Sequence, residues 1–149
     1  MSAPALRKVQ VWIHRANPFA LDGEALVLLL RLREERGGYW QPVTGGVDPG
    51  ETLEIAAMRE AGEETGLVFR GAPRDLHVSF TYENARGRFE EHGFGLEAVT
   101  DLVTLDPREH VEYQWVGLSE ASSLVHHASN RDVLHMLEFL LQGPARDTE

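Results

Sequence analysis

Three glutamates lie close together near the C-terminal end of one predicted helix: Glu60, Glu63 and Glu64. The helix is expected over residues 52–65, because Gly66 suits the left-handed position that ends many helices. A helix C-terminus carries partial negative charge, so each exposed carboxylate there costs about 0.3–1 kcal/mol, and like charges four residues apart add to that cost. A stable domain with this segment therefore has to offset the charge.

The three glutamates fall on one side of this helix at about 100° per residue, together with the small residues Ala56 and Ala57. Arg59 lies at the boundary, four residues before Glu63, where it can offset part of the charge. The opposite side carries three residues that we expect to pack against a sheet: Ile55, Met58 and Gly62.

A divalent cation would reverse the sign of the electrostatic cost. Mg²⁺ prefers oxygen ligands and takes one or two carboxylates together with substrate phosphates. Gly45-Gly46 and Asp48-Pro49-Gly50 precede the helix and predict a tight loop, where a ligand can approach the backbone closely. The alternative is a solvated acidic helix face without a ligand, and charge spacing alone does not decide between the two.

The net charge limits the partners that we expect. The chain has 149 residues and a net charge of −10, from 24 acidic and 14 basic residues. A protein that binds a nucleic-acid duplex normally presents a basic face, so no nucleic-acid partner is expected. An acidic enzyme can still act on an anionic small molecule if divalent cations stand between the charges. The chain has no cysteine, which excludes disulfides and thiolate sites.

Strand patterns outnumber helix patterns, which predicts an α+β fold with a sheet sandwiched by helices. Two shorter helices are expected after the acidic one, over residues 118–126 with Ser119 as cap and over residues 129–141 with Ser129 as cap. Strands are expected at residues 8–13, 25–32, 40–44, 76–82, 93–100 and 113–117.

No linker or repeat divides the chain, so we expect one domain over residues 1–149, ordered from about residue 6 to residue 142. The longest aliphatic run, residues 25–30, is too short to cross a membrane, and no membrane partner is expected. The first residues do not resemble a signal peptide, which favours a cytoplasmic location. The sequence leaves the oligomeric state open, a homodimer included.

The spacing of Gly45, Glu51 and residues 59–67 resembles the signature of the Nudix hydrolase family. Every charged and glycine position of that motif is present, and the one departure is Ala61, where a larger aliphatic residue is usual. The resemblance implies the Nudix fold, a mixed β-sheet sandwiched between α-helices (α/β/α). It also implies a loop–helix–loop segment that carries Mg²⁺ or Mn²⁺.

The same resemblance implies roles for the residues of the motif. Glu60 and Glu64 resemble the principal metal ligands, and Glu63 resembles a further ligand or the general base. A carbonyl near Gly45 would face a metal. The structural positions of the motif are Gly45, Gly46, Glu51, Arg59 and Gly66.

Residues 39–46, 109–115 and 129–131 are similar to a Nudix subfamily that hydrolyses dihydroneopterin triphosphate and dATP-like nucleotides. This similarity implies that Glu109 is a further carboxylate ligand of the metal or the general base. Glu112 is the alternative candidate for this position. Four residues become candidate substrate contacts: Thr44, Arg33, Trp40 and Tyr39. The two aromatic residues are equally compatible with a place in the core, and Arg31 competes with Arg33. Residues 76–97, which should shape the base pocket, match poorly.

We therefore expect a hydrolase in which water attacks a phosphorus of a nucleoside triphosphate-like substrate and pyrophosphate is released. One alternative is a Nudix hydrolase for a nucleotide sugar, ADP-ribose, a dinucleoside polyphosphate or an oxidised nucleotide. Another alternative is a Nudix-fold binding domain without turnover. The sequence leaves open whether Glu63 or Glu109 is the base, how many metals bind and which phosphorus is attacked.

Overall fold

The computed structural model describes residues 5–142. The two ends of the chain beyond the predicted ordered range therefore lie outside the described residues, apart from Ala5. The elements follow in the order β1 (Leu6–Arg15), β2 (Leu26–Leu32), the 3₁₀ turn η1 (Glu34–Arg36), β3 (Trp40–Gln41), β4 (Val43–Gly46), α1 (Leu53–Thr65), β5 (Phe69–Asn84), β6 (Gly87–Ala98), β7 (His110–Gly117), α2 (Leu118–Leu124) and α3 (Ala128–Gln142).

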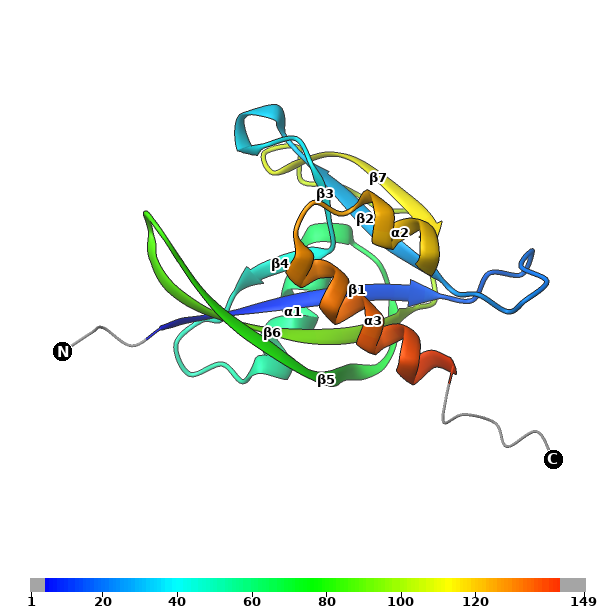
Figure 1. Ribbon diagram of the computed structural model, residues 1–149, viewed down its shortest axis with the longest axis horizontal. Helices are drawn as coiled ribbons and strands as arrows, with labels where there is room; N and C mark the ends of the chain where they lie inside the picture. Colours follow the sequence, from blue (N-terminus) through cyan, green and yellow to red (C-terminus); the bar gives the residue numbers. More distant parts are fainter. Residues whose placement is uncertain (1–4, 143–149) are drawn as a thin grey trace.

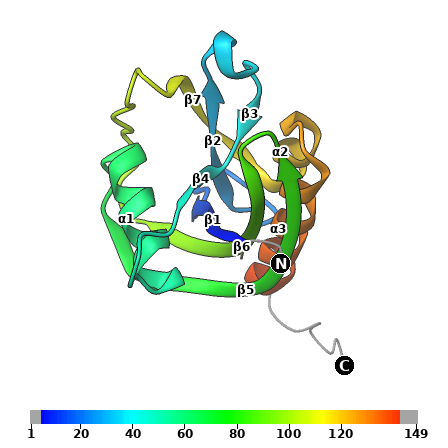
Figure 2. The same ribbon diagram turned by 90° about the vertical axis from the view of Figure 1, so that its left-hand side faces the viewer.

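The strands form one mixed sheet with two layers of helix. Its main path runs β3-β2-β1-β6-β5, while β4 pairs with β1 and β7 pairs with β2. The β1–β6 pair is parallel and the remaining pairs are antiparallel. Figure 2 shows α1 on one side of the sheet and α2 with α3 on the other. The predicted α+β class and the mixed sheet between helices are confirmed.

The central strand β1 is buried on both faces. Figure 1 shows it passing between α1 and α3. Val9 and Val11 pack toward α1, whereas Gln10 and Trp12 face α2 and α3, and all four are fully buried. On the α3 side Gly93 allows close packing, because a Cβ there would lie 2.6 Å from Cγ1 of Val133. Within residues 5–142, no helix is both long and apolar enough to span a lipid bilayer.

The acidic helix has the predicted ends but not the predicted faces. Thr52 caps α1 by accepting a hydrogen bond from the backbone of Ile55, and Gly66 ends the helix in the left-handed conformation, at φ 68°. The expectation that Ile55, Met58 and Gly62 pack on the sheet is wrong for Ile55, which is 58% exposed. Three alanines are fully buried instead: Ala56, Ala57 and Ala61. Small side chains let the backbone of α1 come close to the sheet, and this brings the carboxylate side inward.

The two predicted serine caps are also wrong. Helix α2 follows Gly117, which offers no side-chain cap, and the backbone N–H and hydroxyl of Ser119 both donate to Glu24, at 2.8 and 3.0 Å. Helix α3 already begins at Ala128, so Ser129 lies inside its first turn. A carboxylate from the distant β1–β2 connection replaces the local cap of α2, and sequence spacing gives no indication of this.

Candidate active site

The guanidinium group of Arg59 joins helix α1 to the loop before it. Two of its nitrogens donate to the two carboxylate oxygens of Glu51, at 2.7 and 2.9 Å, and it also donates to the carbonyl of Gly46 at 2.9 Å. The backbone N–H of Asp48 adds a third hydrogen bond to Glu51, at 2.8 Å. The Arg59 hydrogen bonds, with that of Asp48, lower the pKa of Glu51 to about 2. This network fixes the start of α1 against the end of β4.

Arg59 also contacts two of the three clustered glutamates. It donates to Glu60 at 3.0 Å and to the largely exposed Glu63 at 3.3 Å. Glu60 lies against Gly45 so closely that a Cβ at position 45 would overlap the carboxylate. Burial raises the pKa of Glu60, and the hydrogen bond from Arg59 offsets only part of this effect. Glu60 is therefore a half-buried acid whose charge is incompletely compensated by the protein.

Glu64 lies in a second group of polar atoms, formed with Glu109 and His110 at the start of β7. One ligand-type atom of each of these three residues lies within 4.8 Å of the other two. His110 Nδ1 is 3.2 Å from Glu64 Oε2, and the two side chains are 3% and 10% exposed. Among the described residues, neither of these atoms has a partner with hydrogen-bond geometry. Buried polar atoms without a partner point to a missing ligand.

The titration of Glu64 and Glu109 is linked. The neighbouring carboxylate of Glu64 is the main cause that raises the pKa of Glu109, and burial adds to it. Burial alone would also raise the pKa of Glu64, but the neighbouring His110 and Glu109 outweigh burial and lower it. The protonation of one carboxylate therefore affects that of the other. A cation at this position would favour the ionised form of both, because a carboxylate binds metal in its ionised form.

The donors gathered here fit a hard divalent cation. Glu60 and Glu64 are near enough for the charge of Glu64 to raise the pKa of Glu60, and Glu109 approaches Glu64 from the loop before β7. That loop is held by a hydrogen bond from the backbone N–H of Arg33 to the carbonyl of Glu109, at 3.2 Å. Three carboxylates suit Mg²⁺ or Mn²⁺, whereas one histidine and no cysteine make a poor zinc site.

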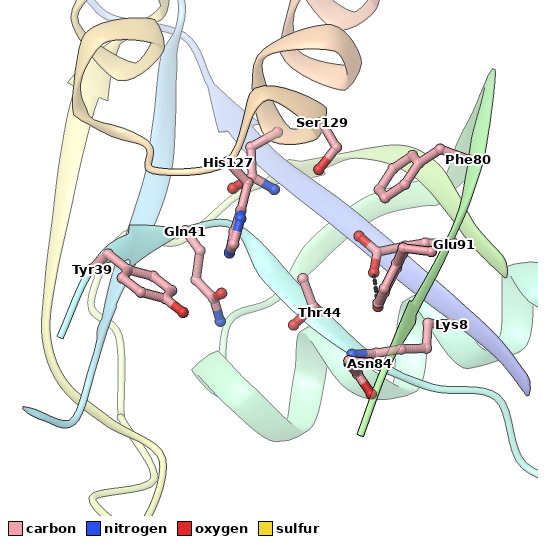
Figure 3. A pocket seen from close by; sticks show the side chains of 11 residues that line it. Lys8, Tyr39, Gln41, Thr44, Phe80, Asn84, Glu91, His127 and Ser129 are labelled. Carbon is pink, nitrogen blue, oxygen red and sulfur yellow. Dashed lines mark hydrogen bonds between the residues drawn. The ribbon is translucent and has the colours of Figure 1, made fainter. Parts of the chain in front are cut away.

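A cavity of about 520 Å³ opens on the α3 side of the sheet. Its wall includes two of the predicted substrate contacts, Thr44 and Tyr39, as Figure 3 shows. The remaining lining residues were not predicted as contacts, although Gln41, Ser129 and Asn130 lie inside runs that sequence reasoning singled out. They come from five elements and one connection: Lys8, Gln41, Phe80, Tyr82, Asn84, Glu91, His127, Ser129 and Asn130.

The other two predicted substrate contacts lie elsewhere. Trp40 is partly buried and packs against the core cluster on the α2 and α3 side. Arg33 forms an ion pair with Glu35 at 2.8 Å, outside the cavity wall. Arg31, the alternative candidate for this substrate contact, donates to Glu112 at 2.6 Å. Glu112 is therefore held on the surface of the sheet and away from the Glu64 group.

The family model described as "NUDIX domain" matches residues 12–137. The chain is 33% identical to an RNA pyrophosphohydrolase of Erythrobacter litoralis over 64% of this chain and 69% of that protein. It is 31% identical to the dihydroneopterin triphosphate diphosphatase of Escherichia coli over 72% of this chain and 79% of that protein. It is also 39% identical to an octanoyltransferase of Myxococcus xanthus, over 79% of this chain but only 32% of that longer protein.

A solved structure shows the same architecture. The Ap4A hydrolase of C. elegans, crystallised as a binary complex, superimposes with a TM-score of 0.76 at 26% identity. The alignment covers 94% of this chain and all of that one. The similarity therefore extends over the sheet and the helices on both of its faces.

Proposed function

The chain belongs to the NUDIX family, and from this premise we propose that it is a metal-dependent pyrophosphohydrolase acting on a nucleoside triphosphate-like substrate. The observation that carries the proposal is the group of Glu64, Glu109 and His110, with unpartnered buried atoms, at the end of a helix whose start Arg59 fixes. An acidic surface patch without a ligand would leave such atoms in contact with water.

We assign the metal site to Glu60, Glu64 and Glu109, with Glu63 beside them. A bound Mg²⁺ or Mn²⁺ neutralises phosphate charge and makes water a better nucleophile at neutral pH. The network of Arg59 and Glu51 would hold α1 at a constant distance from β4, so that Glu60 and Glu64 keep their positions as phosphate enters.

We assign the proton acceptor to Glu109 or Glu63. Glu109 lies beside Glu64 at the proposed ligands, where it could accept a proton from a water molecule. Glu63 is the more exposed of the two and already contacts Arg59. A Glu109→Gln variant that loses turnover, beside a Glu63→Gln variant that keeps it, would identify Glu109 as the base or an essential ligand.

The cavity beside Thr44 supports a substrate with a planar ring. The similarity to the dihydroneopterin triphosphate diphosphatase favours dihydroneopterin triphosphate or a nucleoside triphosphate. The likeness to an Ap4A hydrolase favours a second candidate, a dinucleoside polyphosphate, in which a second nucleoside is esterified to the terminal phosphate. Both substrates would place a triphosphate segment at the same carboxylates.

A substrate panel with Mg²⁺ and Mn²⁺ tests the proposal. It contains dihydroneopterin triphosphate, dATP, dGTP, Ap4A and ADP-ribose, and the released pyrophosphate or nucleotide is quantified by chromatography. We expect Glu64→Gln to lower turnover at least about a hundredfold, since a metal contributes several kcal/mol to charge stabilisation. Glu54→Gln, an exposed glutamate in the first turn of α1, is the matched control. Equal turnover in wild type and Glu64→Gln would refute the assignment.

A further inference from the structure

A buried carboxylate forms part of the cavity wall on the side away from α1. Glu91 lies on β6 and is 5% exposed, yet its carboxylate borders the cavity. Figure 3 shows it facing inward beside Phe80, with Tyr39 and His127 on the opposite side. The proposed phosphate chemistry does not use this residue.

A chain of hydrogen bonds fixes Glu91 as an acceptor. The indole N–H of Trp12 donates to Gln10 Oε1 at 2.8 Å, and because the indole can only donate, the orientation of the Gln10 amide is determined. The amide nitrogen of Gln10 therefore faces Glu91 and donates to Oε2 at 2.8 Å. The hydroxyl of Tyr82 donates to Oε1 at 3.0 Å. Each carboxylate oxygen thus accepts one hydrogen bond from a neutral donor and keeps capacity for another.

Among residues 5–142, Glu91 forms no ion pair with a lysine, arginine or histidine side chain. Lys8, its partner on the neighbouring strand, instead lies over the ring of Phe89, 5.6 Å from the centroid. A buried carboxylate without a cation is costly unless hydrogen bonds satisfy it. Two neutral donors satisfy Glu91 in part. A ligand that brings further donors would use the remaining acceptor capacity of its two oxygens.

The rest of the cavity suits a flat ring. The stacked rings of Phe80 and Tyr82, 6.0 Å apart between centroids, form one aromatic wall. Figure 3 shows Tyr39 and His127 across the cavity from Phe80. Asn130 is 4% exposed, and its Oδ1 has no hydrogen-bond partner within the described residues, which adds a second unsatisfied acceptor. An aromatic slot with acceptors at its edge selects a planar molecule with N–H donors along one side.

We propose that this cavity binds a heterocycle with two adjacent N–H donors, such as the 2-amino-4-oxopyrimidine ring of guanine or a pterin, and that Glu91 determines this specificity. The ring N–H and the neighbouring amino group would each donate to one oxygen of the carboxylate. Adenine offers a ring nitrogen lone pair beside its amino group, so one carboxylate oxygen would face another acceptor. The inference rests on the proposed function and names the substrate class of the same site.

Steady-state kinetics with dGTP, dihydroneopterin triphosphate and dATP test this inference. We expect wild-type kcat/KM to favour the first two over dATP by on the order of 10- to 100-fold, the range of a hydrogen bond to a charged group. Glu91→Gln should bring the ratio close to one, mainly by lowering the efficiency with dGTP. Glu90→Gln, the neighbouring glutamate paired with His92, should keep the wild-type ratio.

Tyr82→Phe provides a second variant if Glu91→Gln does not fold. It keeps the aromatic wall but removes one of the two donors that orient Glu91, and we expect the dGTP to dATP ratio to fall severalfold. Equal wild-type efficiency with dGTP and dATP would overturn the inference, as would a ratio that Glu91→Gln leaves unchanged.

Binding of nucleoside monophosphates separates the inference from the proposed function. In calorimetry without metal, wild type should bind GMP at least about tenfold more tightly than AMP, and Glu91→Gln should lose the difference. If no triphosphate is hydrolysed but GMP is preferred, the proposed function fails and the inference stands. If hydrolysis occurs but GMP and AMP bind alike, only the inference fails.

Discussion

Arg59 connects four parts of the candidate active site through a single side chain. It pairs with Glu51 through two hydrogen bonds, and it reaches Glu60, Glu63 and the carbonyl of Gly46 as well. Lysine could supply the charge but not the fork of donors that this arrangement uses. At the scale of single residues, the position of the acidic cluster therefore depends on one guanidinium group.

Replacement of Glu51 by glutamine should destabilise the protein in a pH-dependent way. The pKa of Glu51 is about 2 in the folded state, below its ordinary value of 4.5, so ionised Glu51 stabilises the fold above pH 4.5. This contribution is lost as the pH falls through 2. Urea unfolding of both proteins should show the largest difference at pH 7 and a shrinking difference from pH 4.5 downward. A difference that stays constant over this range would contradict the pairing.

Gly45→Ala should separate activity from stability. The added methyl group would overlap the Glu60 carboxylate, which lies at the end of a flexible side chain and can move away. We expect the melting temperature to change little, whereas turnover should fall about tenfold or more because Glu60 leaves its place. Gly46→Ala is the matched control, because a Cβ there meets nothing within 4 Å. Equal activity in the two variants would show that the position of Glu60 is not required.

Helix α1 shows what local sequence can and cannot predict. Its ends follow from neighbouring residues, the hydroxyl of Thr52 and the left-handed Gly66, and the sequence predicted them within one residue. Its faces depend on what packs against it, and the apolar residue Ile55 was wrongly placed on the sheet side. Periodicity weights hydrophobicity, whereas the fully buried apolar residues of α1 are alanines.

Two substitutions on α1 test the corrected orientation. Ala57→Leu adds volume at a fully buried position and should cost about 1–3 kcal/mol of unfolding free energy. Ile55→Ala removes an exposed side chain and should change the free energy by no more than about 0.5 kcal/mol. Chemical denaturation measures both variants. The opposite order of effects would restore the orientation predicted from sequence.

The parts of the site that the sequence missed come from distant elements. Glu91 accepts a hydrogen bond from Gln10, 81 residues earlier, and the backbone N–H of Ser119 donates to Glu24, 95 residues earlier. Glu109, by contrast, was identified through its resemblance to family motifs, and the structure brings it beside Glu64. Spacing rules do not detect residues that a sheet register brings together. They do detect residues within one loop–helix segment.

At the scale of the whole molecule, the net charge of −10 has to be reconciled with a polyphosphate substrate. The acidic cluster and the cavity are adjacent at β4, because Glu60 lies against Gly45 and the preceding residue, Thr44, is part of the cavity wall. Cations held by the cluster would reduce the repulsion of the phosphates, while the cavity receives a largely uncharged ring. The single domain over residues 1–149 and the cytoplasmic location stay predictions.

Titration with Mn²⁺ tests the central claim most directly, because the claim is that Glu60, Glu64 and Glu109 hold a divalent cation shared with the phosphates. Calorimetry and electron paramagnetic resonance on the folded protein would measure Mn²⁺ uptake, with and without a non-hydrolysable triphosphate analogue. We predict that wild type binds Mn²⁺, that the analogue strengthens binding, and that Glu64→Gln weakens it at least about tenfold while Glu54→Gln does not. Wild-type protein that takes up no Mn²⁺ under either condition would contradict the account.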